Sequence, residues 1–369
     1  MAKKRIVALE YMRGIAMLGV IGIHTGSQYL SNTFNNIHLI ALLEIVTRFS
    51  VPIFFFISAF GLFYKRDLKQ PFAYKDFLLR RMHSVLLPYL TWSFLYLLHY
   101  TLTYKEYSFC SIPSLINCLF FGLASYQLYF MVILLWFYLL MPLWIKMVKH
   151  MTKLRLIFLL IFQIAFDYYS SYILTGNFSS FFINHLIDYR LNYWVFHYLF
   201  IFILGAYCSI HYENFLNLLK RYSRKITFLF FLSLFGILGY YYSLLYLSGY
   251  STESAINTAH QLSPAGIFYT IGTTLFLFYI FTFKTLPKKI RILCSLLGKH
   301  SYFVYLFHPF AIYYFALFLA SQGKLMTGPI TILFFFAVTF FSILVAICID
   351  KIGKIYPILT LLLTGTKKK

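Results

Sequence analysis

Three ionisable residues fall within the first long apolar run of the sequence, LEYMRGIAMLGVIGIHTG: Glu10, Arg13 and His24. An ionisable group in membrane hydrocarbon is costly, so each is a candidate for function. On a helix, the spacing of Arg13 and His24 places them about 20° apart around the axis and about 16 Å apart along it. A guanidinium can hold an anion or a carbonyl oxygen, and an imidazole can accept a proton near neutral pH. The pair could therefore act on a group that crosses part of a membrane. Pairing of Arg13 with Glu10, one turn earlier, is the structural alternative.

Glu44 and Arg48 form a second candidate pair in the next apolar run. Their i, i+4 spacing lets them meet on one helix face. Pro52 follows and should bend the helix, which would open polar space near Arg48. An ion pair that locks two helices explains this spacing as well as substrate binding does.

A third candidate cluster lies in SYFVYLFHPF, where His308 precedes Pro309. Tyr302 and Tyr305 lie three and six residues before His308, roughly on its side of a helix. These side chains could border a substrate cavity, or they could only form hydrogen bonds between helices. Weaker candidates are Asp167, His99 and His197, whereas we expect His83, His150, His211 and His300 to be solvated near basic helix ends.

The elements that carry these residues are long apolar runs. Of 369 residues, 61% are hydrophobic and 11% are charged, against about 45–50% and about 25% in soluble domains. A membrane helix needs roughly 20 apolar residues. We therefore predict an all-α integral membrane protein with about ten transmembrane helices. The predicted helices span residues 6–30, 40–64, 84–103, 124–147, 154–173, 191–210, 226–247, 265–284, 298–320 and 329–350.

Basic residues alternate between the loops of this scheme. One set of loops and termini holds 27 of the 32 Lys and Arg residues, and the opposite set holds only Lys105, Arg190 and Lys324. The positive-inside rule then places both termini in the cytoplasm. It also explains the net charge of +22 without nucleic acid. We expect one polytopic domain over residues 1–369 that ends in a short basic cytoplasmic tail at 351–369, and a first helix that is retained, not cleaved.

Several kinds of soluble-enzyme site are absent from the sequence. It has no GxSxG, HExxH or Walker motif. With ten acidic residues in all, it lacks the acid-rich metal clusters of phosphoryl-transfer enzymes, and its five cysteines show no zinc spacing. We predict no metal site. Cys110 and Cys118 share one outer loop and could form a disulfide.

Five segments, in order, resemble the acyltransferase-3 family of membrane O-acyltransferases. YMRGIAMLGVIGIHTG resembles its first-helix signature, an arginine and a histidine with ten residues between them. The other four segments are RFSVPIFFFISAFGLFYK, FLLRRMHSVLLPYLTWS, YQLYFMVILLWFYLLMPL and LGKHSYFVYLFHPFAIYY, which resemble the second, third, fourth and ninth helices. The sequence differs from the family pattern at Ala59, at His83 and Ser84, and at Tyr126 and Gln127.

The resemblance implies an O-acyltransferase in the plasma membrane of a bacterium. Its donor substrate would be a cytoplasmic acyl-CoA, commonly acetyl-CoA, with no tightly bound cofactor. Its acceptor would be a sugar hydroxyl on a cell-envelope or secreted glycan. The family signature falls on Arg13 and His24, with Arg48 as a supporting site, and the basic start of the third helix keeps Arg80 and Arg81 on the donor side. The expected partners are acyl-CoA, the glycan acceptor and the bilayer.

A transporter or flippase for a glycan or lipid-linked precursor is the main alternative. It would also have many helices, buried charges and basic loops. Such proteins often contain internal repeats with paired broken helices. No convincing repeat relates residues 1–180 to 181–369, which favours the enzyme. A receptor would not need Arg13 and His24 on one helix face.

Overall fold

The computed structural model describes residues 6–31 and 35–367, which form helices joined by turns, without any strand. In chain order the helices are α1 (Val7–Leu30), α2 (Ile37–Ile40), η1 (Ala41–Ile45), α3 (Ser50–Phe63), α4 (Tyr74–Arg81), η2 (Met82–Leu86), α5 (Leu87–Tyr104), η3 (Ser108–Cys110), α6 (Ile112–Phe121), α7 (Tyr129–Leu139), α8 (Met141–Lys149), α9 (Lys153–Tyr168), η4 (Tyr169–Ile173), α10 (Phe181–Asp188), α11 (Arg190–Tyr193), η5 (Val195–Tyr198), α12 (Leu199–Ile210), α13 (Tyr212–Arg221), α14 (Ser223–Tyr246), α15 (Thr252–Thr258), α16 (Pro264–Phe283), α17 (Lys288–Ser321), α18 (Gly328–Ile352) and α19 (Pro357–Thr364).

Eight of the described helical segments are long and apolar enough to cross a membrane, and the number rises to ten if each of two bent pairs counts as one span. The prediction of an all-helical protein with about ten spans is therefore confirmed. All ten predicted helices coincide with one of these segments or bent pairs. The cytoplasmic location of the termini stays a prediction.

The bends within the two bent pairs were not predicted from the sequence. The predicted helix 124–147 is α7 followed by α8, with an angle of 64° between them. Pro142, in the first turn of α8, cannot continue the hydrogen-bond ladder of α7. At the other pair the chain turns by 100° between Val195–Ile210 and α13. The amphipathic helix α13 buries Phe215 and Leu219 on one side and exposes most of its polar residues.

Two predicted helices begin too late. The third starts at Tyr74 instead of residue 84, and the ninth starts at Lys288 instead of residue 298. Basic residues mark the ends of apolar runs, but Arg and Lys are good helix formers, so the helices continue through them. One consequence is a correction: His300, which we expected to be solvated, lies inside α17 and is buried.

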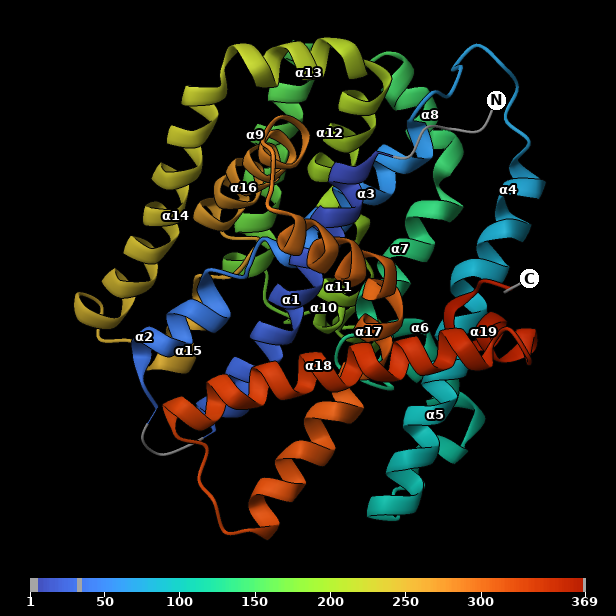
Figure 1. The fold of residues 1–369 in the computed structure, drawn as a ribbon, viewed down its shortest axis with the longest axis vertical. Coiled ribbons are helices and arrows are strands. Elements are labelled where there is room, and N and C mark those ends of the chain that lie inside the picture. The colour runs from blue at the N-terminus through green and yellow to red at the C-terminus, as the bar shows by residue number, and fades with distance from the viewer. Residues whose placement is uncertain (1–5, 32–34, 368–369) are drawn as a thin grey trace. The chain divides into compact units, whose positions relative to one another are not determined.

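The chain divides into two compact units. Unit 1 consists of Met1–Arg66, Met151–Tyr172 and Tyr198–Ile343, and unit 2 of Asp67–His150, Ile173–His197 and Leu344–Lys369. In unit 1, α1 packs against α17, α3 and α16, while α3 also packs against α12. The long helices α14 and α16 of this unit lie side by side, as the yellow and orange ribbons of Figure 1 show.

In unit 2, α7 packs against α11, and α5 packs against α19. Helix α19 lies in the segment that we expected to be a basic tail. Its Leu363 carbonyl accepts a hydrogen bond from the indole of Trp92 on α5 at 3.0 Å. Cys118 on α6 is a buried free thiol, so the considered disulfide with Cys110 is not formed. The side chain of Cys110 lies outside the described part of the structure.

Candidate functional site

Two histidines from distant parts of the sequence meet inside unit 1. His24 on α1 and His308 on α17 stack with their ring centroids 5.2 Å apart and an angle of 24° between the ring planes. The two helices are also tied together elsewhere, because Ser295 of α17 donates a hydrogen bond to the Glu10 carboxylate of α1 at 2.7 Å. His308 is fully buried and His24 is half-buried. The nearly parallel rings can therefore serve one reacting group together.

Pro309 determines the proton position on His308. Proline has no backbone N–H, so the carbonyl of Tyr305, four residues earlier, loses its normal helical donor. The His308 Nδ1 atom lies 2.8 Å from this oxygen and 3.1 Å from the Val304 oxygen. Because a carbonyl only accepts, Nδ1 must carry the proton. In the neutral ring Nε2 then keeps its lone pair and can act as a base.

Arg48 lies beside this histidine pair. Its guanidinium is close enough to His24 for its charge to act on the imidazole. The Nη2 atom lies 3.3 Å from Oε2 of Glu44, which confirms the pairing predicted from their spacing. The other oxygen of Glu44 accepts a hydrogen bond from Ser27 of α1 at 2.8 Å. Arg48 is 12% exposed and Glu44 is 3% exposed, so the ion pair is largely shielded from surrounding solvent or lipid.

Arg48 lies in a break in the second membrane segment. The π-helix η1 ends at Ile45, and residues 46–49 form a turn before α3 starts at Ser50. We expected a bend caused by Pro52, but Pro52 lies in the first turn of α3, where proline is well tolerated. The break comes before it. The Val46 carbonyl at the break accepts a hydrogen bond from the Tyr269 hydroxyl at 2.7 Å, which satisfies a polar group that hydrocarbon could not.

Gly26 allows α1 to approach the ion pair. A Cβ atom at this position would lie 2.8 Å from Cγ of Glu44, closer than real contacts allow. Glycine is therefore required where α1 passes the carboxylate. His24, two residues earlier on the same helix, takes its position from the same close approach.

The group formed by His24, His308, Arg48 and Glu44 is called the centre below. The other predicted residues of unit 1 lie at different distances from it. Arg13 is exposed on α1, and because α1 is continuous from Val7 to Leu30, it stays about 16 Å from His24 along the axis. Tyr305 contacts the centre, with its ring centroid 6.2 Å from that of His308. Tyr302 is half-buried, nearly two turns before His308.

Arg80 and Arg81, the predicted donor-binding residues, belong to unit 2. Arg80 is exposed at the end of α4. The guanidinium of Arg81 lies over the rings of Phe77 and Tyr138, at 5.3 and 5.2 Å from their centroids. Packing therefore uses one face of Arg81, while Arg80 remains accessible to an anion.

Sequence reasoning missed one histidine beside Arg48. His260 lies in the turn between α15 and α16, and the charge of Arg48 reaches it as it reaches His24. Arg48 also donates a hydrogen bond from Nη2 to the Ile256 carbonyl of α15 at 3.3 Å. The sequence signal was the polar stretch HQLSP between two apolar runs, in which Ser263 and Pro264 predict the start of a helix.

Two further buried groups have structural partners. Asp167 on α9, one of the weaker candidates, is fully buried and accepts a hydrogen bond from Gln163 at 2.7 Å. Gln163 in turn accepts one from the Phe200 amide at 3.0 Å. This chain of bonds joins α9 to the first turn of α12.

Within the described residues, no group of three or more His, Cys, Asp or Glu side chains could hold a metal ion.

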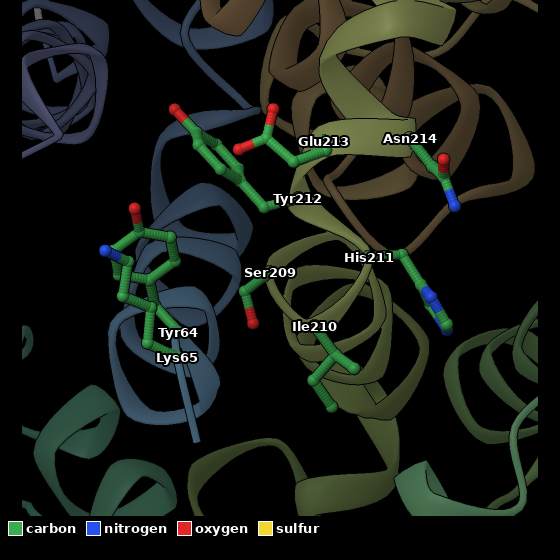
Figure 2. Close-up of a pocket in the computed structure, with 8 residues that line it drawn as sticks. All are labelled: Tyr64, Lys65, Ser209, Ile210, His211, Tyr212, Glu213 and Asn214. Carbon is green, nitrogen blue, oxygen red and sulfur yellow. The ribbon is translucent and has the colours of Figure 1, made fainter. Parts of the chain in front are cut away.

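Figure 2 shows a pocket of about 330 Å³ where α3 ends and α12 turns into α13. Tyr64 and Lys65, just after the end of α3, line one side, and the α12–α13 corner supplies the other. Its remaining lining residues are Ser209, Ile210, His211, Tyr212, Glu213 and Asn214. Lys65 and Glu213 carry opposite charges, so the pocket does not single out an anionic ligand.

The centre therefore combines two imidazoles, which can exchange protons, with a guanidinium, which can stabilise a developing negative charge on oxygen. Comparison with protein families gives one match, described as an acyltransferase domain, over residues 6–351. Comparison with curated proteins and with solved structures gave no match. The matched region contains both histidines, Arg48 and all ten predicted membrane segments, and the chain belongs to the acyltransferase-3 family of membrane acyltransferases.

Proposed function

We propose that this membrane acyltransferase moves an acyl group, most simply acetyl, from cytoplasmic acyl-CoA to a sugar hydroxyl of an extracytoplasmic or lipid-linked glycan. The observation that carries the proposal is the stacking of His24 and His308 at 5.2 Å, beside the Arg48–Glu44 ion pair. Basic groups of this kind are what an alcohol needs to become a nucleophile toward a thioester. The proposed location is the plasma membrane of a bacterium.

In the direct route, His24 removes the proton from the sugar hydroxyl as its oxygen attacks the thioester carbonyl. The new C–O bond forms, the C–S bond breaks, and the CoA thiolate takes the proton from the imidazolium. Arg48 lies beside His24 and supports the negative charge that develops on the carbonyl oxygen. Glu44 holds the guanidinium in place through its 3.3 Å contact.

A covalent route uses the same atoms in two steps. The His24 imidazole first attacks the thioester and releases CoA as its thiol, which leaves an acyl-imidazole. The sugar hydroxyl then attacks this intermediate: the new C–O bond forms, the C–N bond to His24 breaks, and the hydroxyl proton passes through a base to the departing imidazole, which regenerates neutral His24. His308 is suited to be that base, since the proton on Nδ1 leaves Nε2 with a lone pair.

The donor enters from the cytoplasmic side in this proposal. Arg13 orients the donor about 16 Å before His24, a distance that an extended pantetheine arm can cover. Arg80 and Arg81, which belong to unit 2, stay candidates for attracting the anionic CoA from the cytoplasm. Tyr305, which lies against His308, and the half-buried Tyr302 border the acceptor.

The test is transfer of label from acetyl-CoA carrying ¹⁴C in the acetyl group. Membranes that contain the protein should move the label into the glycan fraction of the producing cells, whereas membranes with His24→Gln should not. Equal labelling by the two membranes would contradict the proposed site. Absence of label from every glycan, together with transfer to another class of acceptor, would contradict the proposed substrate.

A further inference from the structure

The turn between α15 and α16 carries a histidine that the proposed reaction has not used. His260 lies two residues after the end of α15 at Thr258 and four before Pro264, which starts α16. It is outside the membrane-spanning helices and half-buried. Ile256 of α15 accepts the hydrogen bond from Arg48 at 3.3 Å. The helix that leads into this turn is therefore attached directly to Arg48.

The backbone around His260 is held rigidly. Ser263 donates a hydrogen bond to the His260 carbonyl at 2.8 Å, and the same hydroxyl accepts one from the Gly266 amide at 3.0 Å as the cap of α16. A Cβ atom on residue 266 would lie 2.3 Å from the His260 oxygen, so only glycine fits there. A residue held in this way can position a ligand without an entropic cost for ordering itself.

The imidazole of His260 is held as firmly as its backbone. Its ring stacks on Tyr172 of η4 with centroids 5.7 Å apart and an angle of 20° between the planes. The Tyr172 hydroxyl donates to the Thr258 carbonyl at 2.6 Å, which fixes the aromatic ring to the same turn. The orientation of the imidazole is thus determined by contacts on its face and along its backbone.

The proton on His260 must lie on Nε2. The Leu262 amide donates a hydrogen bond to Nδ1 at 3.0 Å, so Nδ1 holds the lone pair. Burial and the nearby positive charge of Arg48 lower the pKa of His260 to about 4, which keeps the ring neutral at pH 7. Among the described residues, no hydrogen bond engages Nε2. His260 therefore offers one fixed, uncharged N–H donor beside Arg48.

An uncharged donor suits a hydroxyl or ring oxygen of a sugar better than a phosphate. The phosphates of CoA carry full negative charges, for which the exposed cations of the chain are the natural partners. The turn also belongs to a loop that is predicted to lie on the outer side, opposite the basic loops. Both considerations associate His260 with the acceptor and not with the donor.

We propose that His260 binds the acceptor glycan, donating a hydrogen bond from Nε2 to a sugar oxygen and so fixing the hydroxyl that is acylated. This inference rests on the proposed function, since it presumes a sugar acceptor. It assigns acceptor recognition to the turn between α15 and α16, whose His260 feels the charge of the same Arg48 guanidinium that acts on His24.

Two amide substitutions distinguish the hydrogen-bond donor at Nε2 of His260 from the other atoms of its ring. His260→Gln places an amide N–H near the position of Nε2, whereas His260→Asn can keep the contact with the Leu262 amide but has no donor at Nε2. The assay follows transfer of the labelled acetyl group to octyl β-glucoside, kept below its micellar concentration, in membranes containing each variant. The matched controls are His211→Gln and His211→Asn, at an exposed histidine on the corner between α12 and α13.

We expect His260→Asn to raise KM for the glucoside about tenfold, the effect of losing one hydrogen bond worth about 1.4 kcal/mol. His260→Gln should stay within about threefold of the wild type, and both His211 variants should match it. KM for acetyl-CoA and the slow hydrolysis of acetyl-CoA without acceptor should not change in any variant. If His260 had a purely structural role, its loss should affect these two quantities as well.

Two results would overturn the inference: an unchanged KM for the glucoside in His260→Asn, or an equal increase for both substrates in both amide variants. A wild-type protein that hydrolyses acetyl-CoA but labels no glycoside would instead contradict the proposed sugar acceptor. The failure of the inference and the failure of the proposed function are thus distinguished by the wild-type control.

Discussion

His308 and His260 carry their protons on opposite nitrogens. His308 is protonated at Nδ1 because backbone carbonyls face that atom, and His260 is protonated at Nε2 because a backbone amide faces its Nδ1. One ring is thereby prepared to accept a proton and the other to donate a hydrogen bond. Neither property follows from residue type. Both are imposed by backbone geometry, through Pro309 in one case and the Leu262 amide in the other.

His24 is the residue whose replacement should be most informative. We expect His24→Gln to be produced and stably inserted but to lose about 10²–10⁴-fold in transfer rate, because an amide cannot act as a general base. His308→Gln should lose less. Transfer is measured with labelled acetyl-CoA, and the membrane level and thermal unfolding temperature are measured in parallel. Wild-type turnover by His24→Gln would exclude a catalytic role for this residue.

Arg13 provides a separate test at the same scale. Arg13→Lys keeps the charge but loses the planar fork, so we expect a large loss of transfer at a near-normal protein level. Because Arg13 is exposed on α1, the substitution should leave the unfolding temperature unchanged. Full activity of Arg13→Lys would show that only the positive charge of Arg13 is needed.

At the scale of elements, the helices were predictable and their breaks were not. Apolar runs of sufficient length located every membrane segment. The break at residues 46–49 lies inside one such run, so hydrophobicity carries no sign of it. Arg48 could be singled out from the sequence as an expensive charge. Its place beside His24 depends on this break and on the packing of α1 against η1 and α3, which no local pattern specifies.

A substitution at Gly26 tests whether the close approach of α1 to Glu44 determines the geometry of the centre. Gly26→Ala would place Cβ at 2.8 Å from Glu44, so α1 or the carboxylate must move, at a cost of about 1–3 kcal/mol for overpacking. We expect a lower unfolding temperature and reduced transfer. The control is Gly236→Ala on α14, where a Cβ atom meets nothing within 4 Å; it should leave both quantities close to those of the wild type. Equal behaviour of the two variants would contradict the proposed constraint.

At the scale of the whole molecule, the sequence predicts which side of the membrane each loop occupies. In a cysteine-free background, single cysteines at Lys105, Glu253 and Gln322 should react with an impermeant reagent added outside. Cysteines at Lys69 and Tyr222 should react only after the membrane is opened. The reason is the concentration of 27 of 32 basic residues on one side of the scheme. Two or more positions that label from the wrong side would overturn it.

The candidate site was only partly predictable at this scale. Arg13 and His24 share a helix, so their relation followed from helical geometry. His24 and His308 are far apart in the sequence, and their stacking depends on how α1 packs against α17. His260 was missed because its importance comes from its neighbour Arg48 and from a rigid turn, neither of which a single sequence displays.

The hydrogen bond from Tyr269 to the Val46 carbonyl has a consequence for biosynthesis. The two residues are 223 positions apart in the chain. At about 5–20 residues per second, a ribosome needs roughly 11–45 s to make the intervening segment. During this interval the broken segment lacks the hydroxyl that satisfies its exposed carbonyl, which hydrocarbon alone does not tolerate. The hydrogen bond at the break, and with it the complete reaction centre, can therefore form only after α16 has been made.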